Sequence, residues 1–510
     1  MFGFHIPTAD ILRVKVDPKD VPPPTPVVFP APHKPGPGSG GASAEQQKLT
    51  SLVETLQRVY RPNDIKPQVF DTLRLKTYYD ANPVEIIPDP TYLPDFASWS
   101  RLSAEEAREL NQATRIPLNN GNLSPGCQVY FDRRAELSNP NEDAFRTVRR
   151  QPPQQGRRQP RLGNSYEFFR CLELMTPYWD DPTAPPQPPP AEDNPEPGPA
   201  SDSEPSTANG PAAEESDIRY RTMAGTQMPA EVRHNVLSAF IKLVAYDFGC
   251  NVTTPRVEPR LNLTTPPSPG GASRKSYVPS GCIFVFRTPM KKEQARGGFT
   301  EGPVAAVTAR ASVGFDDPLE TNQDLAREVL AALVTAQHRY REGKEEKRFG
   351  EGQWWTTRPR WGGGSGGPIG REIDRDEVVG DKDGSSPPTK KPRKTISAYD
   401  NYRMVRPPAL TWDRKTKYEA IGSVPGAGYD DVFVISCIFH HVSVLRVRVP
   451  KGLLRALEGN VDEEFGGDLV FWRSKWYDLF VTEERIAAVE LLWGVFAYQM
   501  RTQGEEKPGS

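Results

Sequence analysis

The sequence has few cysteines, and they are far apart. Five occur in 510 residues, without a CxxC pair: Cys127, Cys171, Cys250, Cys282 and Cys437. A structural zinc site built on cysteine is therefore not expected. An odd, sparse set of thiols is typical of a reducing compartment, where disulfides are rare.

Long hydrophobic runs and a strong net charge are also missing. The apolar fraction is 36%, below the usual range of about 45–50%, and no run approaches the roughly 20 apolar residues of a membrane helix. The opening residues, MFGFHIPTADILRVKVD, lack the pattern of a signal peptide. Because the formal net charge is only −2, no overall field attracts nucleic acid or membrane. We expect a soluble protein of the nucleus and/or cytoplasm, without membrane contact.

Sequence motifs of common enzyme and cofactor sites are absent as well. There is no P-loop, no strand-linked GxGxxG and no HExxH, so nucleotide-binding and zinc-hydrolase interpretations have no support. We therefore expect no cofactor and no metal. The sequence leans against an enzyme, although a site assembled from scattered residues stays open.

The only adjacent histidines are His440 and His441. Neighbours on a strand point to opposite faces, so these two are predicted not to chelate one metal ion together. A turn near Phe439–His441, with a capping or partly buried role for the pair, is the expected arrangement.

Proline (54) and glycine (41) are abundant and divide the chain into packed and unpacked segments. The unpacked segments are predicted to be a Pro-rich tail, an acidic and Pro-rich disordered linker, a disordered loop with a basic cluster, and a short final tail, at residues 1–44, 180–217, 364–407 and 503–510. In the first segment, PPPTP and FPAP favour polyproline II. They could be ligands of SH3 or WW-type modules, and a solvated tail is the simpler interpretation.

The packed segments mix helical and strand patterns. Residues 45–179 are predicted to be mostly helical, with a basic loop at 146–161. Residues 218–363 form an α+β core, and residues 408–502 form a β-hairpin plus a C-terminal helix that packs on this core. Because strands and helices alternate without a steady βαβ order, we expect an α+β fold with helices on a small mixed or antiparallel sheet.

The 218–345 segment loosely resembles the core of PD-(D/E)xK nucleases, with a helix, strands, and a helix containing Gln337 and Tyr340. That resemblance implies an Asp on one strand and E-x-K on the next, which hold a metal and position water. Here the second strand offers only Glu301 before it and Arg310 near its end. An active nuclease is therefore not expected, whereas a degenerate copy of the fold stays open.

Two basic clusters are candidates for contacts with charged partners. Six arginines without an acid lie in one run and could contact phosphates, or form a solvated loop, or fold back on the acidic linker: Arg146, Arg149, Arg150, Arg157, Arg158 and Arg161. The other cluster resembles a nuclear-import signal, and it consists of Lys390, Lys391, Arg393 and Lys394.

Three of the nine tryptophans lie in EGQWWTTRPRWGGGSGG, residues 351–367. Exposed aromatic rings beside arginines could stack on nucleobases, or could fill a groove of a partner protein. Most tryptophans are buried, so packing on the chain's own domain is the simplest interpretation. The candidate binding residues are Trp354, Trp355, Arg358, Arg360 and Trp361.

Four blocks, FFRCLELMTPYWDD, EGQWWTTRPRWGGG, YDDVFVISCIFHHVSVLRVRVP and KWYDLF, are similar to those of a family of large intracellular proteins from filamentous ascomycete fungi. The resemblance implies a fungal source and supplies no reaction, cofactor or catalytic residue. The sequence thus predicts a non-enzymatic interaction, regulatory or scaffold protein with protein partners. The alternatives are a nucleic-acid-associated nuclear factor and an enzyme or pseudo-enzyme with a degenerate PD-(D/E)xK-like core.

Overall fold

The computed structural model of the chain describes most of the segments predicted to be packed. The described residues are 18–33, 51–59, 62–185, 220–252, 259–266, 273–287, 289, 299–310, 314–341, 417–424, 426–460 and 467–502. The predicted tail 503–510, most of the linker 180–217 and all of the loop 364–407 lie outside these residues.

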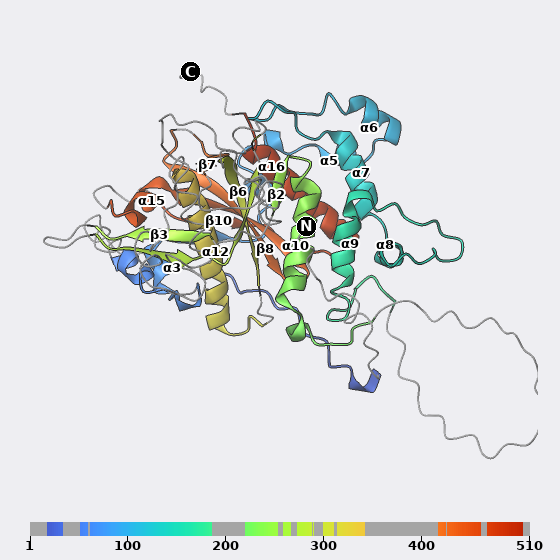
Figure 1. Cartoon of the computed structure of the whole chain (residues 1–510), viewed down its shortest axis with the longest axis horizontal. Helices are drawn as coiled ribbons and strands as arrows, with labels where there is room; N and C mark the ends of the chain where they lie inside the picture. Colours follow the sequence, from blue (N-terminus) through green and yellow to red (C-terminus); the bar gives the residue numbers. More distant parts are fainter. Residues whose placement is uncertain are drawn as a thin grey trace, which may run out of the picture.

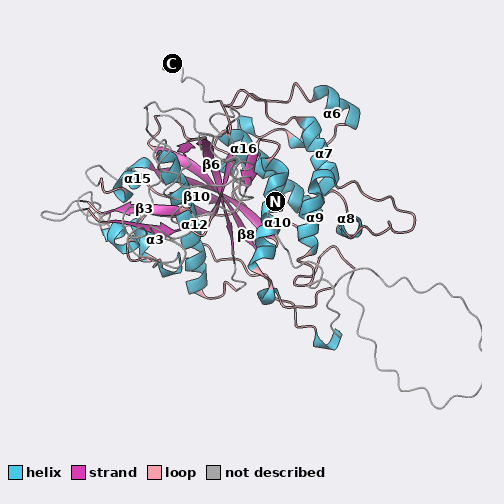
Figure 2. Ribbon diagram, viewed as in Figure 1, coloured by secondary structure: helices cyan, strands magenta, loops and turns pink. Residues whose placement is uncertain are grey.

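A nine-stranded mixed sheet runs through the centre of the molecule (Figures 1 and 2). Its strand order is β1-β10-β9-β8-β6-β5-β2, with β11 also paired to β9 and β7 to β6. The bounds are β1 Lys76–Tyr78, β2 Cys250–Val252, β5 Ile283–Arg287, β6 Phe299–Ala309, β7 Lys417–Glu419, β8 Tyr429–Ile438, β9 His441–Pro450, β10 Val470–Arg473 and β11 Tyr477–Asp478. The α+β prediction is confirmed, but the sheet is large rather than small. Local sequence patterns predict single strands, and they do not show how many strands from distant segments pair into one sheet.

The two packed halves of the chain meet at β6 and β8, which pair in parallel, with Ala306 opposite Val434. On one side of this pair, β2, β5 and β6 are antiparallel, and on the other, β8 and β9 form the predicted hairpin. A parallel pair requires a crossover connection, and α12 (Pro318–Tyr340) lies between the two strands in sequence. The C-terminal hairpin therefore belongs to the same sheet as the middle segment.

Helices cover both faces of the sheet. On β5, Phe284 packs with α12 on one face, while Val285 faces α10 (Ala230–Ala245) and α16 (Thr482–Gln499) on the other. This alternation follows from the two-residue period of a strand. β8 is buried from Asp430 to Ile438, and residues 432–435 of this stretch are a continuous apolar run, as expected for a strand covered on both sides.

Helix signals in the sequence correspond to helix ends in the structure. Ser103 caps α6 (Ala104–Leu110), and its hydroxyl accepts a hydrogen bond from Glu106 N while the Glu106 carboxylate accepts one from Ser103 N. α12 begins after Asp317, whose side chain accepts a hydrogen bond from Leu319 N. These contacts pair backbone donors that a helix start leaves free.

The other described elements are short and surround the sheet. A separate two-stranded sheet consists of β3 Arg260–Thr264 and β4 Lys275–Pro279. The short α-helices are α3 Gln68–Thr72, α4 Pro83–Ile86, α5 Phe96–Trp99, α7 Cys127–Leu137, α8 Asn141–Val148, α9 Tyr166–Glu173 and α15 Lys451–Leu457. The 3₁₀ helices are η1 Pro18–Asp20, η2 Pro62–Asp64, η3 Pro90–Tyr92, η4 Gly163–Ser165 and η5 Gly225–Gln227. In Figure 1, α9 lies beside α10. Residues 62–179 contain α3 to α9 and one strand, β1, so this described part of the N-terminal region is mostly helical.

Candidate binding site beneath the proline-rich segment

A buried cluster of charges joins the first half of α12 to the ends of three strands. Asp324 and Glu328 are four residues apart, so they share one helix face. Arg310, just beyond β6, forms ion pairs with both, and its Nη2 lies 2.7 Å from Glu328 Oε1. Arg473, at the end of β10, also pairs with Glu328. Ser436 Oγ on β8 donates to Glu328 Oε1 at 2.8 Å. The cluster ties the helix to the sheet.

Burial sets the electrostatics of this cluster. Arg310, Asp324 and Glu328 are at most 1% exposed. Burial alone would raise the pKa of Glu328, but the Arg473 and Arg310 guanidinium groups outweigh burial and hold this pKa below its usual range. Burial lowers the pKa of Arg310 to about 10, against the attraction of Glu328. Two acids and two arginines balance, as buried charges require.

A cavity of about 330 Å³ opens beside the cluster. Its lining includes Asp324, Glu328 and Arg473 of the cluster, and Pro30 and Pro32 of the proline-rich segment. The remaining lining residues are Ala31, His33, Tyr79, Phe315, Asp316, Pro318, Thr321, Asn322, Leu325 and Trp476. The size is that of a small-ligand pocket, with apolar walls and a few charged groups.

The proline-rich segment, residues 21–33, is held against the body at both ends. At its start, Arg221 Nη1 donates to Pro22 O, and Gly225 N donates to Thr25 Oγ1 at 2.8 Å. At its end, His33 N donates to Tyr79 Oη at 2.8 Å, and Thr77 Oγ1 donates to His33 O at 3.2 Å. The segment has neither helix nor strand, so side chains of the body replace the missing backbone pairing.

Phe29 is the aromatic anchor of the proline-rich segment. Its ring stacks on Trp476, with centroids 5.2 Å apart and planes 7° apart, and meets His441 edge-on at 5.0 Å. Val28 packs against the main core. The prediction of a solvated tail is therefore wrong for residues 21–33. Composition favours an extended chain whether it is solvated or docked, so it could not reveal the aromatic surface on which this segment lies.

The arrangement of His440 and His441 also differs from the prediction. The turn lies where it was expected, but the two rings face each other, with centroids 4.2 Å apart. Their Nε2 atoms lie 3.6 and 3.7 Å from Asp478 Oδ2. β8 ends at Ile438, and Phe439 has φ 55°. This left-handed residue breaks the strand alternation on which the prediction of opposed side chains depended.

The histidine pair and Asp478 form a small polar group in which His440 is buried and the other two residues are half-buried. Burial and the neighbouring His440 ring lower the pKa of His441 to about 3. Burial alone would raise the pKa of Asp478, but the two imidazoles outweigh it and lower this pKa. Phe480 and Trp179 rings enclose His440 at centroid distances of 4.9 and 5.5 Å.

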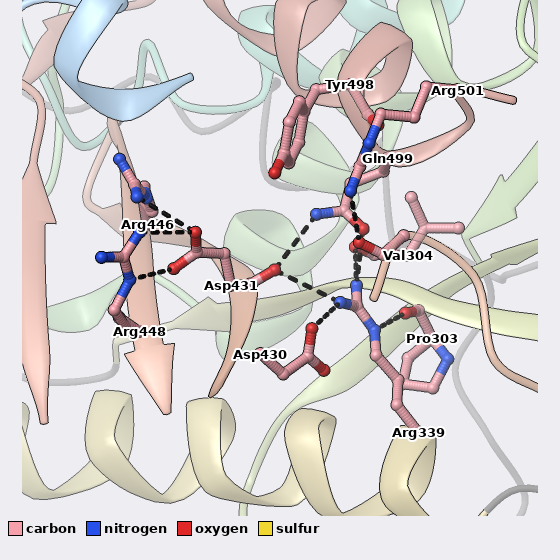
Figure 3. A network of polar contacts seen from close by, with 11 residues as sticks. Pro303, Val304, Arg339, Asp430, Asp431, Arg446, Arg448, Tyr498, Gln499 and Arg501 are labelled. Carbon is pink, nitrogen blue, oxygen red and sulfur yellow. Dashed lines mark hydrogen bonds and ion pairs between the residues drawn. The ribbon is translucent and has the colours of Figure 1, made fainter. Parts of the chain in front are cut away.

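A second charge cluster lies toward the other end of α12 (Figure 3). Arg339 forms an ion pair with Asp430 at 3.2 Å and donates to backbone carbonyls of Pro303 and Val304. Gln499 Oε1 on α16 accepts a further bond from Arg339 at 2.9 Å. This cluster joins α12, β6, β8 and α16. Its hydrogen bonds hold these four elements together, and none of its residues lines the cavity described above.

Asp431, next to Asp430, extends the second cluster to the neighbouring strand. Its carboxylate pairs with Arg446 at 3.0 Å and with Arg448 at 3.1 Å, both on β9. Arg446 also lies over the Trp472 ring at 4.3 Å. The two arginines that alternate with apolar residues on β9 therefore both pair with Asp431 on the neighbouring strand of the hairpin, β8.

The predicted Trp-rich arm and import cluster lie outside the described residues. These are Trp354, Trp355, Arg358, Arg360 and Trp361, and Lys390, Lys391, Arg393 and Lys394. Their roles stay predictions.

The six-arginine run is described, and part of it pairs with acids of its own region. Arg149 Nε lies 2.5 Å from Glu173, and Arg157 Nη1 lies 2.9 Å from Asp143. Arg146 donates to Pro152 O. Four arginines are exposed: Arg150, Arg157, Arg158 and Arg161. The loop thus contacts acids of α8 and α9, and its predicted role in phosphate contact stays untested.

The strands that resemble a nuclease core carry no metal-binding pair of carboxylates. Within residues 273–287 and 299–310 the one acid is Glu301, and it pairs with Arg287. Gln337 is buried and binds the backbone of Asn262 through both amide atoms. This glutamine therefore holds an outer strand.

Sequence reasoning missed the buried cluster around Glu328. A signal was present, because Asp324 and Glu328 are four residues apart in a helix whose neighbouring stripe is apolar. Their partners Arg310 and Arg473 lie far apart in sequence and belong to no motif, so the pairing itself was not predictable.

Comparison with family models, curated proteins and solved structures found no match for the chain. Among the described helices, none combines the length and apolar character needed to cross a bilayer. The geometry above is therefore the basis for any functional proposal.

Proposed function

We propose that the chain is a non-enzymatic interaction protein of regulatory or scaffold type, resident in the nucleus and/or cytoplasm of a fungus. In this proposal residues 21–33 are an intramolecular ligand. The surface beneath them accepts proline-rich segments of protein partners once the chain's own segment leaves. The observation that carries the proposal is Phe29, which lies between Trp476 and His441.

The surface has the features that extended proline-rich ligands require. Such ligands lack internal hydrogen bonds and lose little conformational entropy on binding, and they dock in aromatic-lined grooves. Here Trp476 and His441 supply the aromatic walls. Arg221 and Thr77 donate to carbonyls at the two ends of the segment. The contacts thus match an extended ligand at its centre and at both ends.

Because residues 21–33 belong to the same chain as the surface, they compete strongly with partner segments for it. A short linker gives an effective concentration of about millimolar, so a partner segment with the same contacts would displace it only in part. A partner must bind more tightly, or the segment must first be loosened. The surface is therefore regulated by its own occupant.

The test is binding of a fluorescently labelled peptide with the sequence of residues 18–33, followed by anisotropy. The full chain with Phe29→Ala should bind the peptide at least about tenfold more tightly than the wild type, since ~1.4 kcal/mol of lost anchoring frees the surface by that factor. Val27→Ala is the matched control. Val27 is 38% exposed, so its loss should leave peptide affinity unchanged.

Two outcomes would contradict this proposal. Equal peptide affinities for the wild type and Phe29→Ala would show that the segment does not compete for the surface. Unchanged affinity after a further Trp476→Ala substitution in the Phe29→Ala chain would place the peptide elsewhere. Circular dichroism of each variant establishes that it is folded.

A second candidate is a pseudo-enzyme with a degenerate PD-(D/E)xK-like core. The order of α10, the antiparallel strands β2, β5 and β6, and α12 supports it, as does the lack of a carboxylate pair on those strands. The chain should therefore cleave neither DNA nor RNA with Mg²⁺ or Mn²⁺. Metal-dependent cleavage that disappears in Glu301→Gln would overturn this expectation.

A further inference from the structure

We propose that His440, His441 and Asp478 bind one divalent transition-metal ion of the zinc class. The inference does not rest on the proposed interaction function, because the three side chains belong to the body. His440 lies in the turn after β8, His441 begins β9, and Asp478 ends β11. One ligand atom from each lies within 4.8 Å of the others.

The distances between these atoms suit a shared ion better than hydrogen bonds. The two Nε2 atoms lie 3.6 and 3.7 Å from Asp478 Oδ2, beyond normal hydrogen-bond length. Ligands of a tetrahedral zinc at ~2.0–2.1 Å are themselves roughly 3.4 Å apart. A small inward movement would therefore place all three at bonding distance from one ion.

The histidine rings lack other polar partners. Neither Nδ1 atom has a hydrogen-bond partner among the residues that the structure describes, and His440 is only 4% exposed. Each Nε2 atom also lies beyond hydrogen-bond length of Asp478 Oδ2, and an ion bound at the Nε2 atoms would give each imidazole a strong interaction. The Nδ1 atoms would then carry the ring protons, as in the neutral tautomer that leaves Nε2 free for a metal.

The backbone holds the three residues together without the ion. His441 and Asp478 are opposite each other in the pairing of β9 with β11, and Leu479 N donates to His440 O at 3.0 Å. Phe480 N donates to Asp478 Oδ1 at 2.9 Å, which turns Oδ2 toward the rings. Binding would therefore need little reorganisation of the chain.

Two imidazoles and one carboxylate are a donor set that zinc accepts, with a fourth position left for water or a ligand. Softer thiolate-selective metals are disfavoured, because none of the three residues offers sulfur. The Phe29 ring packs edge-on against His441. The proline-rich segment therefore borders the site.

The test is calorimetric titration of Zn²⁺ into the untagged, chelator-treated full chain. We expect one equivalent to bind to the wild type. His441→Gln and Asp478→Asn should weaken this binding at least about 100-fold. Because loss of His440 would disturb the buried turn, the near-isosteric Asp478→Asn variant is decisive. His234→Ala is the matched control, since His234 is exposed on α10 and its loss should change nothing.

A spectroscopic readout separates a defined site from surface binding. Co²⁺ in the wild type should give the visible absorption of a low-symmetry nitrogen and oxygen site, and Asp478→Asn should lose it while keeping its circular dichroism. The proposal is overturned if the wild type binds no Zn²⁺ above the buffer background. It is equally overturned if His441→Gln and Asp478→Asn, both folded, bind Zn²⁺ as the wild type does.

Discussion

The two charge clusters along α12 both pair acids with arginines, but the helix supplies the acids in one cluster and the arginine in the other. Near the start of the helix, Asp324 and Glu328 are on α12 and the arginines are on the sheet. Near its end, Arg339 is on α12 and Asp430 is on β8. Only Arg339 lies in a terminal turn of α12, where the helix dipole favours a base. Asp324 and Glu328 lie beyond the first turn, so their ion pairs with the sheet, and not the dipole, stabilise the position of the helix there.

The difference between the clusters is their access to open space. Asp324 and Glu328 border the cavity beneath the proline-rich segment, whereas backbone carbonyls and Gln499 surround Arg339. Ion pairs between acids and arginines thus form an enclosed cluster around Arg339, whereas at Asp324 and Glu328 they form part of the wall of a candidate site. The comparison teaches that buried charge alone does not mark a candidate site, whereas a cavity beside it gives a ligand room to bind.

The largest loss of stability is expected at the cluster around Arg339. Arg339→Met would leave Asp430 buried without its cation, which costs about 3–5 kcal/mol. Urea unfolding at neutral pH measures this loss. Arg170→Met removes an exposed pair with Glu167 and serves as the control, with an expected loss of about 0.2–1 kcal/mol. Equal losses in the two variants would contradict the role given to Arg339.

Substitution in the cluster around Glu328, beside the cavity, should cost less stability, and the loss should depend on pH. Glu328→Gln should destabilise the fold by about 2–3 kcal/mol at neutral pH, because Asp324 still pairs with Arg310 and water in the cavity can partly solvate Arg473. Since the folded-state pKa of Glu328 is lowered, its stabilising contribution is present above its unfolded pKa of about 4.3. The contribution is lost as pH falls through the folded pKa. The difference in the free energy of unfolding between the wild type and Glu328→Gln, measured in urea, should therefore become smaller below about pH 4.3. A difference that grows there would contradict this account.

A smaller effect is expected at the anchor of the proline-rich segment. Phe29→Ala removes a half-buried ring with two aromatic contacts, and we expect a loss of about 1–2 kcal/mol. Thermal unfolding gives the comparison with Val27→Ala, which should remain within about 0.5 kcal/mol of the wild type. If both substitutions have the same effect, the ring does not anchor the segment.

The smallest effect concerns the hydrogen bond at the end of the segment. Tyr79→Phe removes the acceptor of His33 N and should cost about 0.5–1.5 kcal/mol. Both Phe29 and Tyr79 hold the same segment, so the double variant should lose less than the sum of the single losses. Strict additivity in a double-mutant cycle would indicate that the two contacts are independent.

Local patterns in the sequence predicted much of the fold. β6 and β8 carry runs of apolar and β-branched residues, and β9 alternates apolar residues with arginines. An apolar stripe at helical spacing marks α10 and α12, and α16 is apolar almost all round. Ser103, a residue type that favours N-caps, directly precedes α6. These signals depend on neighbouring residues, and neighbours in sequence determine periodicity and helix capping.

The candidate site was less predictable because it depends on distant contacts. Arg473 reaches Glu328 across 145 positions of sequence, and Phe29 meets Trp476 from the other end of the chain. The turn at His440 was expected, but its left-handed Phe439 was not, and that residue decides where the two rings point. A proline-rich composition likewise cannot distinguish a docked segment from a solvated one.

The central claim is that residues 21–33 dock on the body through Phe29, and ¹⁹F NMR of 5-fluorotryptophan at Trp476 tests it most directly. The resonance is assigned with Trp476→Phe. The stacked Phe29 ring should shift it by its ring current, so Phe29→Ala should move the resonance, and excess peptide of residues 18–33 should return it toward the wild-type position. An identical resonance in the wild type and Phe29→Ala, unaffected by the peptide, would contradict the docking.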